Sequence, residues 1–297
     1  MQDARRQFRL TSADSLHVPW HLEIMRALTF LRRPDVREAP VRLLLRRVAL
    51  SLVSRLAPER LQLPRTFRLS NGLLITASLK DSVCKDLFVH GSFEWETLKA
   101  WEAAIPVGGT AIDVGAHIGT FTLTAAKKVG DQGSVLAFEP NPASRVLLEA
   151  NVRQNGFEDR VRVLPYALLD CSVRLPLGTP TASNSGMARL GMGEELVTCR
   201  PLDDVVRELG YHAADVVKID VEGSEAQVLD GAAELVRSCQ PIIIMEVNGT
   251  EALDRLRDLG YVLRTPGGQP FLDAAQHQRP GESVNVLALP HPATSRG

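Results

Sequence analysis

The order of apolar and polar positions along the chain predicts strands that alternate with helices. Short apolar runs bounded by turn residues are typical of buried strands, and apolar residues that recur every three to four positions are typical of amphipathic helices. Runs of the first kind begin at Thr110, Gly133, Val161, Asp215, Pro241, Tyr261 and Val284. Segments of the second kind separate most of them, which predicts an α/β fold with a mostly parallel sheet.

Three of the helices between these strands have predictable limits. They span residues 141–155, 224–236 and 251–259. Gly156 and Gly260 follow the first and the third, and glycine just past the last turn ends a helix readily. The second continues directly from the strand that begins at Asp215.

A strand pair is predicted ahead of the first core strand. Residues 66–70 and 73–77 flank Asn71-Gly72, a turn signal that joins antiparallel strands. Residues 81–101 follow, and Ser92 is expected to cap a helix that covers the ligand site. Residues 170–200 contain too many turn formers for a helix, so we expect an excursion between short strands.

The first 65 residues are predicted to form a basic, mainly helical extension. Pro34 and Pro40 divide the helical pattern into two helices, the second over residues 41–56. Residues 1–70 contain 14 arginines and six acids, a net charge of +8, whereas the whole chain carries −1. A basic amphipathic helix can touch a membrane surface, face an acidic partner, or pack on the body with its arginines in water.

Composition predicts a soluble globular protein. Of the 297 residues, 44% are hydrophobic and 23% are charged, which suits a domain over residues 66–290 with a cofactor-binding core at 105–265 and a tail at 291–297. The four cysteines lack the spacing of a zinc site or a disulfide framework. No apolar run approaches the roughly 18 residues of a membrane span and no secretory leader is evident, so the expected location is cytoplasmic.

The turn after the first core strand carries the most informative motif. Asp113 stands two residues before Gly115, and Gly119 follows four residues later. A dinucleotide fingerprint has closer glycines that let the backbone approach a pyrophosphate, which the carboxylate of Asp113 would repel. The same carboxylate suits a cationic ligand, although the glycines could equally serve only the turn.

Glu139 stands at the end of the second core strand. An acid at this place can accept hydrogen bonds from both hydroxyls of a ribose. A ligand with a ribose, no phosphate and a positive centre is S-adenosyl-L-methionine, which we predict as the cofactor. Ala167, beyond the third strand, would then lie beside the adenine.

Polar residues at the end of the fourth core strand are the catalytic candidates. Lys218, Asp220 and Glu222 are two residues apart, so in a strand they would project to one side. Methyl transfer to a hydroxyl requires removal of a proton. Asp220, Glu222 or His117 could supply the base, with Lys218 orienting the acid or offsetting its charge. Asp220 and Glu222 could instead cap the following helix, and His117 could be an ordinary helix N-terminal residue.

These segments together resemble the FkbM family of S-adenosylmethionine-dependent methyltransferases. The resemblance rests on residues 112–119, 138–141 and 218–225, with 91–94 and 202–204 in support, and it covers roughly residues 80–265. It implies a Rossmann-like class I methyltransferase fold, with a seven-stranded, mostly parallel sheet and helices on both faces. It also implies O-methylation of a sugar, polyketide or related natural-product hydroxyl.

The resemblance places the cofactor on Asp113, Gly115 and Glu139. His117 departs from it, since the family usually has asparagine there. The full set of expected cofactor-binding residues is Glu94, Asp113, Gly115, His117, Gly119, Glu139, Ala167 and Asp220.

Two other classes of function remain open. A nucleic-acid methyltransferase would use the basic arm, but the turn that such enzymes usually carry after the fourth strand is replaced by residues 220–223. A non-catalytic binding module would be expected to have lost one of its three acids, Asp113, Glu139 or Asp220. As partner, the resemblance implies a small hydroxyl acceptor, whether glycoside, polyketide or lipid-linked. No spacing demands a metal, although Asp203, Asp204, Asp220 and Glu222 could hold magnesium.

Overall fold

The computed structural model describes residues 40–178, 188–272 and 283–291. Its contacts divide the chain into two units, residues 1–49 and 50–297. Helix α2 (Pro40–Leu56) confirms the helix predicted over residues 41–56, whereas the helix predicted ahead of Pro34 lies outside the described residues. Within the described ranges, no helix combines the length and the hydropathy that a membrane span requires.

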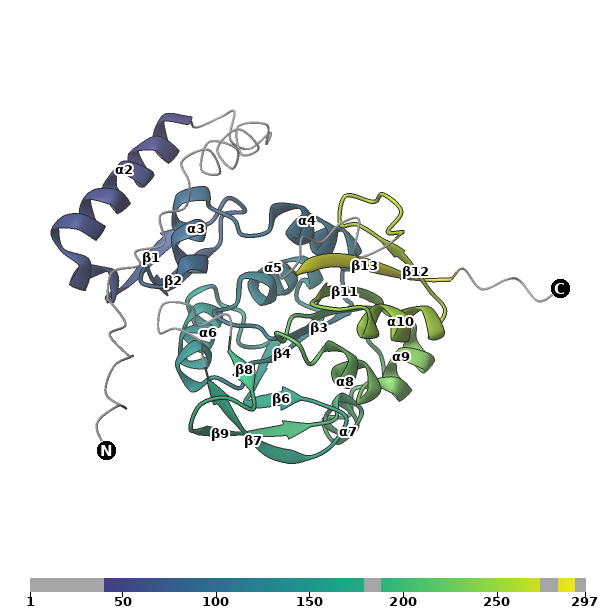
Figure 1. Ribbon diagram of the computed structural model, residues 1–297. Helices are drawn as coiled ribbons and strands as arrows, with labels where there is room; N and C mark the ends of the chain where they lie inside the picture. Colours follow the sequence, from purple (N-terminus) through teal and green to yellow (C-terminus); the bar gives the residue numbers. More distant parts are fainter. Residues whose placement is uncertain (1–39, 179–187, 273–282, 292–297) are drawn as a thin grey trace, which may run out of the picture. The chain divides into compact units, whose positions relative to one another are not determined.

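A seven-stranded sheet forms the centre of the second unit (Figure 1). Its strand order is β12-β13-β11-β10-β3-β4-β5. The strands from β11 to β5 are parallel, and β13 is antiparallel to both of its neighbours. The bounds are β3 (Thr110–Val114), β4 (Ser134–Phe138), β5 (Val161–Leu164), β10 (Val216–Ile219), β11 (Ile242–Val247), β12 (Tyr261–Arg264) and β13 (Val284–Pro290). The predicted fold class is thus confirmed.

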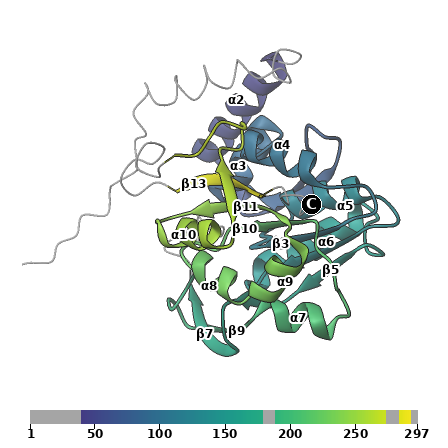
Figure 2. The same ribbon diagram turned by 90° about the vertical axis from the view of Figure 1, so that its right-hand side faces the viewer.

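Helices cover both faces of this sheet (Figure 2). Because successive strand residues point to opposite faces, Ala111 of β3 enters one apolar core and Ile112 enters the other. Helices α3 to α6 contribute to the first core, and α7 to α10 to the second. Their bounds are α3 (Ser82–His90), α4 (Trp95–Ala104), α5 (Thr120–Val129), α6 (Pro142–Gln154), α7 (Leu202–Glu208), α8 (Glu225–Asp230), α9 (Ala233–Cys239) and α10 (Glu251–Asp258).

Two predictions about helices were wrong. The helix expected over residues 224–236 is split into α8 and α9 next to Gly231, where a β-carbon would lie 2.0 Å from the carbonyl oxygen of Leu169. Ser92 is buried and does not cap a helix. The N-cap of α4 is Glu94, and Asp81 caps the separate helix α3 by accepting two backbone N–H bonds.

Two smaller sheets accompany the large one. The predicted strand pair is confirmed as β1 (Pro64–Arg68) and β2 (Leu74–Ser78), which are antiparallel. The predicted excursion forms a four-stranded sheet of order β6-β9-β7-β8. Its strands are β6 (Tyr166–Leu168), β7 (Val173–Gly178), β8 (Arg189–Leu190) and β9 (Glu195–Arg200).

The position of β3 determines where a ligand can enter. From β3 the chain goes outward to β4 and β5 on one side, and it returns to β10 and β11 on the other. Loops that leave neighbouring strands in opposite directions open a crevice at the carboxyl ends of those strands. In this sheet the crevice lies between the ends of β3 and β10.

Candidate active site

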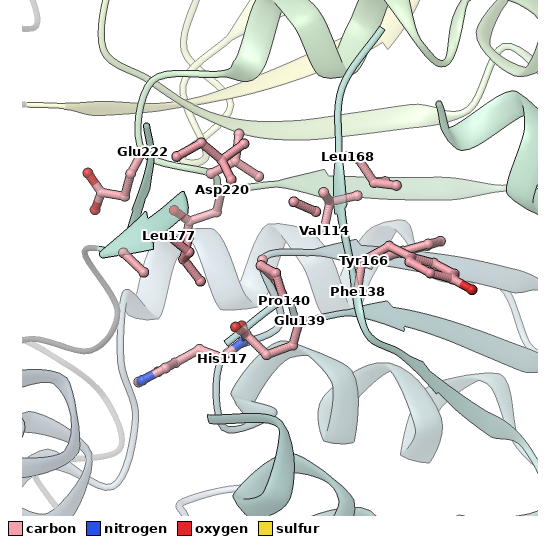
Figure 3. Close-up of a pocket in the computed structure, with 15 residues that line it drawn as sticks. Val114, His117, Phe138, Glu139, Pro140, Tyr166, Leu168, Leu177, Asp220 and Glu222 are labelled. Atoms are coloured by element: carbon pink, nitrogen blue, oxygen red, sulfur yellow. The ribbon is translucent and has the colours of Figure 1, made fainter. Parts of the chain in front are cut away.

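A pocket occupies this crevice and encloses roughly 560 Å³, including the part open to solvent. Asp220 and Glu222 gather at one end, and Phe138, Tyr166 and Leu168 lie toward the other (Figure 3). The remaining lining residues are Val114, Gly115, His117, Glu139, Pro140, Ala167, Leu177, Ala188, Leu190 and Val221.

Glu139 is held by backbone N–H groups of the loops that follow β3 and β4. One carboxyl oxygen accepts the N–H of His117 at 2.7 Å, and the other accepts the N–H of Asn141 at 2.8 Å. Burial raises the pKa of Glu139 to about 7, although both N–H bonds favour the ionised form. Each carboxylate oxygen can accept a second hydrogen bond, so the fixed carboxylate retains the capacity to bind two hydroxyl groups.

The turn that begins at Gly115 brings two strand ends together. Gly115 has φ +82°, and a β-carbon on it would lie 1.9 Å from the carbonyl oxygen of Asp220. His117 follows in the left-handed region with φ +50°, and burial lowers the pKa of its imidazole. Both residues line the pocket.

Asp113 and Gly119 do not line the pocket. Asp113 is fully buried in β3 and accepts the hydroxyl of Thr122 of α5 at 2.6 Å. Its Oδ1 is a buried oxygen to which no described residue donates a hydrogen bond, and burial raises its pKa despite the nearby charge of Lys218. Gly119 packs against α6, because a β-carbon there would lie 2.6 Å from the side chain of Leu148. The structure therefore gives these two motif residues roles in the core beneath the pocket.

Lys218 and Asp220 form a buried ion pair at the polar end of the pocket. The lysine Nζ lies 2.8 Å from Asp220 Oδ2, and the lysine side chain is 3% exposed. Burial alone would raise the pKa of Asp220, but the charge of Lys218 and hydrogen bonds from Glu246 and Lys218 hold it below its usual value. Asp220 therefore stays ionised at neutral pH and points a basic oxygen toward the pocket.

Glu222 lies beside Asp220 and has a different partner. It adopts φ +56°, and its Oε2 lies 3.4 Å from Arg189 of β8. Burial, and then the charge of Asp220, raise its pKa. Helix α8 begins at Glu225, whose own carboxylate accepts the N–H of Gly223. The observed side-chain bonds of Asp220 and Glu222 thus join them to Lys218 and Arg189, whereas helix capping would join them to backbone N–H groups at the start of α8.

Two further acids, Glu94 and Glu246, interact with Asp220. Only Glu94 was among the predicted site residues. Glu94 accepts a hydrogen bond from Asn285 Nδ2 at 3.2 Å, and burial followed by the charge of Asp220 raises its pKa to about 7. Glu246 of β11, which sequence reasoning missed, has a carboxylate oxygen within 4.8 Å of one of Asp220. The signal was present as an acid that interrupts an otherwise apolar strand, but its significance depends on the register between strands.

The four acids considered for magnesium divide into two pairs. Asp203 accepts two N–H bonds at the start of α9, and Asp204 pairs with Arg207. Oxygens of Asp220, Glu222 and Glu246 lie within 4.8 Å of one another and could accept a hard cation. The ammonium of Lys218 also supplies positive charge at Asp220.

In the strand order, the antiparallel strand β13 is inserted between β11 and β12. The family model described as the methyltransferase FkbM domain matches residues 113–263, just over half of the chain. The chain therefore belongs to the FkbM methyltransferase family, as the sequence motifs predicted.

Three relatives of known description match parts of the chain. The methyltransferase sdnD of Sordaria araneosa is 29% identical over 165 residues, which cover 44% of this chain and 63% of the relative. The hexuronic acid methyltransferase AglP of Haloferax volcanii is 29% identical over 143 residues, covering 48% and 57%. The 31-O-demethyl-FK506 methyltransferase FkbM of Streptomyces tacrolimicus is 31% identical over 207 residues, covering 58% and 79%.

The chain thus spans about 60% of the length of the first two relatives. Among solved structures, the FkbM methyltransferase of Methylobacillus flagellatus superposes with a TM-score of 0.42 at 15% identity, over 69% of this chain and 52% of that one.

Proposed function

We propose that the protein transfers a methyl group from S-adenosyl-L-methionine to a hydroxyl of a small organic acceptor. The observation that carries this proposal is the polarity of the pocket in the crevice. It has an apolar end beside the fixed carboxylate of Glu139, and the ionised carboxylate of Asp220 stands at the other end. A nucleoside fits the first end, and proton removal fits the second.

The residues present fit the cofactor. Glu139 would accept both ribose hydroxyls, and Ala167 would lie against the adenine together with Phe138 and Leu168. When bound, the cofactor supplies an activated methyl group on a sulfonium. The acids at the polar end would favour that positive charge, and Gly115 and His117 would border the path between the two ends.

Asp220 is the proposed general base. When the bound cofactor gives its methyl group to the acceptor oxygen, Asp220 would take up the proton that the hydroxyl loses. Lys218 keeps Asp220 ionised before the transfer, and Glu222 and His117 are the alternative bases.

The acceptor class is inferred from the relatives. One is named for a hexuronic acid and another for the O-demethyl form of FK506, so a glycoside, a polyketide or a lipid-linked form of either is the proposed acceptor. The test is transfer of labelled methyl from the cofactor to a panel of these three acceptor types, with and without a chelator. Activity without metal on a hydroxyl acceptor is expected. Labelling of nucleic acid in preference to every small acceptor would overturn the proposal.

A further inference from the structure

The register of three neighbouring strands brings Asp220 and Glu246 together. Ile219 of β10 pairs with Met245 of β11, so the next residue of each strand, Asp220 and Glu246, are also neighbours. Glu246 in turn pairs with Asn285 of β13. Residues opposite each other in adjacent strands point to the same face of a sheet. The three polar side chains therefore form one row at the edge of the crevice.

Asp220 and Glu246 bring carboxylate oxygens within 4.8 Å of each other. Two carboxyl groups that share a site disfavour the state in which both are ionised, because their like charges repel. We therefore expect one of the two to carry a proton. Lys218 Nζ is 2.8 Å from Asp220, which makes Asp220 the ionised member and leaves the proton on Glu246.

The surroundings of Glu246 oppose a second negative charge. Glu94 at the start of α4 and Asp220 at the end of β10 both act on it, while the hydroxyl of Ser283, just before β13, donates a hydrogen bond to its Oε1. The positive charge of Lys218, from β10, interacts with the negative charges of Asp220, Asp113 and Glu94, which raise the pKa of the lysine. Glu222 adds a further carboxylate within 4.8 Å. Burial and the charge of Asp220 raise the pKa of Glu246 to about 9.

We propose that Glu246 is a positioning residue that works in its protonated form and donates a hydrogen bond that aims the carboxylate of Asp220 at the acceptor hydroxyl. This inference rests on the proposed function. During transfer the acceptor proton goes to Asp220, and Glu246 keeps its own proton. Asp220 releases its proton to solvent after the methylated product leaves, so the pair returns to one shared proton.

Two substitutions separate this role from a merely structural one. Glu246→Gln keeps a donor of similar shape, because the side-chain amide can donate to Asp220. Glu246→Ala removes the donor. We expect turnover of the Gln variant within about threefold of wild type at pH 8, and a loss of about tenfold or more for Ala, the rate equivalent of one hydrogen bond.

The pH profile gives the sharper readout. Wild-type turnover should fall above about pH 9, as Glu246 ionises and repels Asp220, whereas Glu246→Gln should lack this alkaline fall. Glu158→Gln is the control, since Glu158 is an exposed glutamate and its substitution should leave the profile unchanged. A Gln variant as slow as the Ala variant, or one that keeps the alkaline fall, would overturn the proposal.

Infrared spectroscopy tests the proton without any acceptor. At pH 8, Glu94 and Glu139, whose pKa values are about 7, are mostly ionised, and Glu246 is protonated. The difference spectrum between wild type and Glu246→Gln should show the carbonyl band of one carboxylic acid, and that between wild type and Glu158→Gln should not. No such band would overturn the inference. If the band is present but no acceptor is methylated, the proposed function fails and the shared proton stands.

Discussion

The α-carbon of Gly115 lies against the carbonyl oxygen of Asp220, with no room for a side chain between them. This contact joins the turn after β3 to the end of β10, and so it sets the width of the crevice between the cofactor motif and the proposed base. A methyl group at Gly115 would have to separate the two strand ends.

Gly115→Ala should therefore damage both folding and binding. The β-carbon would meet the backbone at 1.9 Å, and residue 115 has φ +82°, which an alanine adopts only with strain. Overpacking and strain together predict a loss of about 2 kcal/mol or more in the free energy of unfolding. Chemical denaturation measures it. Gly249→Ala is the control, because a β-carbon there meets nothing within 4 Å; equal stability of the two variants would contradict the prediction.

Glu139 should make cofactor binding depend on pH. Its pKa is raised from 4.5 in the unfolded chain to about 7 in the folded protein, so ionising it costs folding stability as the pH rises between these values. Ribose hydroxyls donate to the ionised form. Affinity for S-adenosylhomocysteine should thus increase as the pH rises through about 7.

Calorimetry at pH 6 and pH 8 checks the dependence on Glu139. Glu139→Gln should bind more weakly at pH 8 and lose the change with pH, while Glu139→Ala should weaken binding by about 1.5 to 3 kcal/mol. Glu149→Gln, an exposed change on α6, serves as the control. A Gln variant that keeps the wild-type pH dependence would remove Glu139 from the binding site.

Asp220→Asn should separate chemistry from binding. Asparagine preserves the shape of the side chain but cannot accept a proton, so turnover should fall by about 10² to 10⁴. The Kd of the cofactor should change little, which marks a role in the transition state. Asp159→Asn, at an exposed aspartate, is the control. Near-normal turnover of Asp220→Asn at every accessible pH would transfer the role of base to Glu222 or His117.

The length of the N-terminal truncation should decide whether the protein stays stable. Residues 50–297 form one unit, and Leu50 and Val53 of α2 pack against its core. Deleting residues 1–49 should leave cofactor binding intact, whereas deleting residues 1–60 should cost about 1 to 3 kcal/mol of unfolding free energy through lost apolar burial. Thermal unfolding of both truncations measures the difference. Equal melting temperatures would show that the packing of α2 contributes nothing.

Features that depend on residues close in the sequence could be predicted, and features that depend on residues distant in the sequence could not. The core strands were predictable because each is a short apolar run whose burial on both faces is visible in its own residues. The break between α8 and α9 was not predictable in this way. It lies beside Gly231, which packs closely against Leu169, a residue distant in the sequence. The predicted N-cap of α4 was also wrong. Ser92 has the local sequence features of a cap, but it lies buried and α4 begins after Glu94.

Within the site, residues that follow a single strand were easier to predict than pairs across strands. Glu139 and Asp220 stand directly after apolar runs, and both line the pocket. Asp113 belongs to the same motif, yet its carboxylate is turned into the core toward Thr122. Glu246 could have been found only by knowing that β10 and β11 are neighbours and in which register.

Strands β7 and β8 form a wall of the pocket that is separate from the parallel sheet. Leu177 and Leu190 reach the pocket from these two strands, and Leu177 belongs to an apolar cluster with Val197 and Cys199 of β9. Glu139, Lys218 and Asp220 belong instead to the parallel sheet and its loops. Redesign of β7 and β8 would therefore change which acceptor fits, while β6, beside the proposed adenine site, and the three charged residues stay in place.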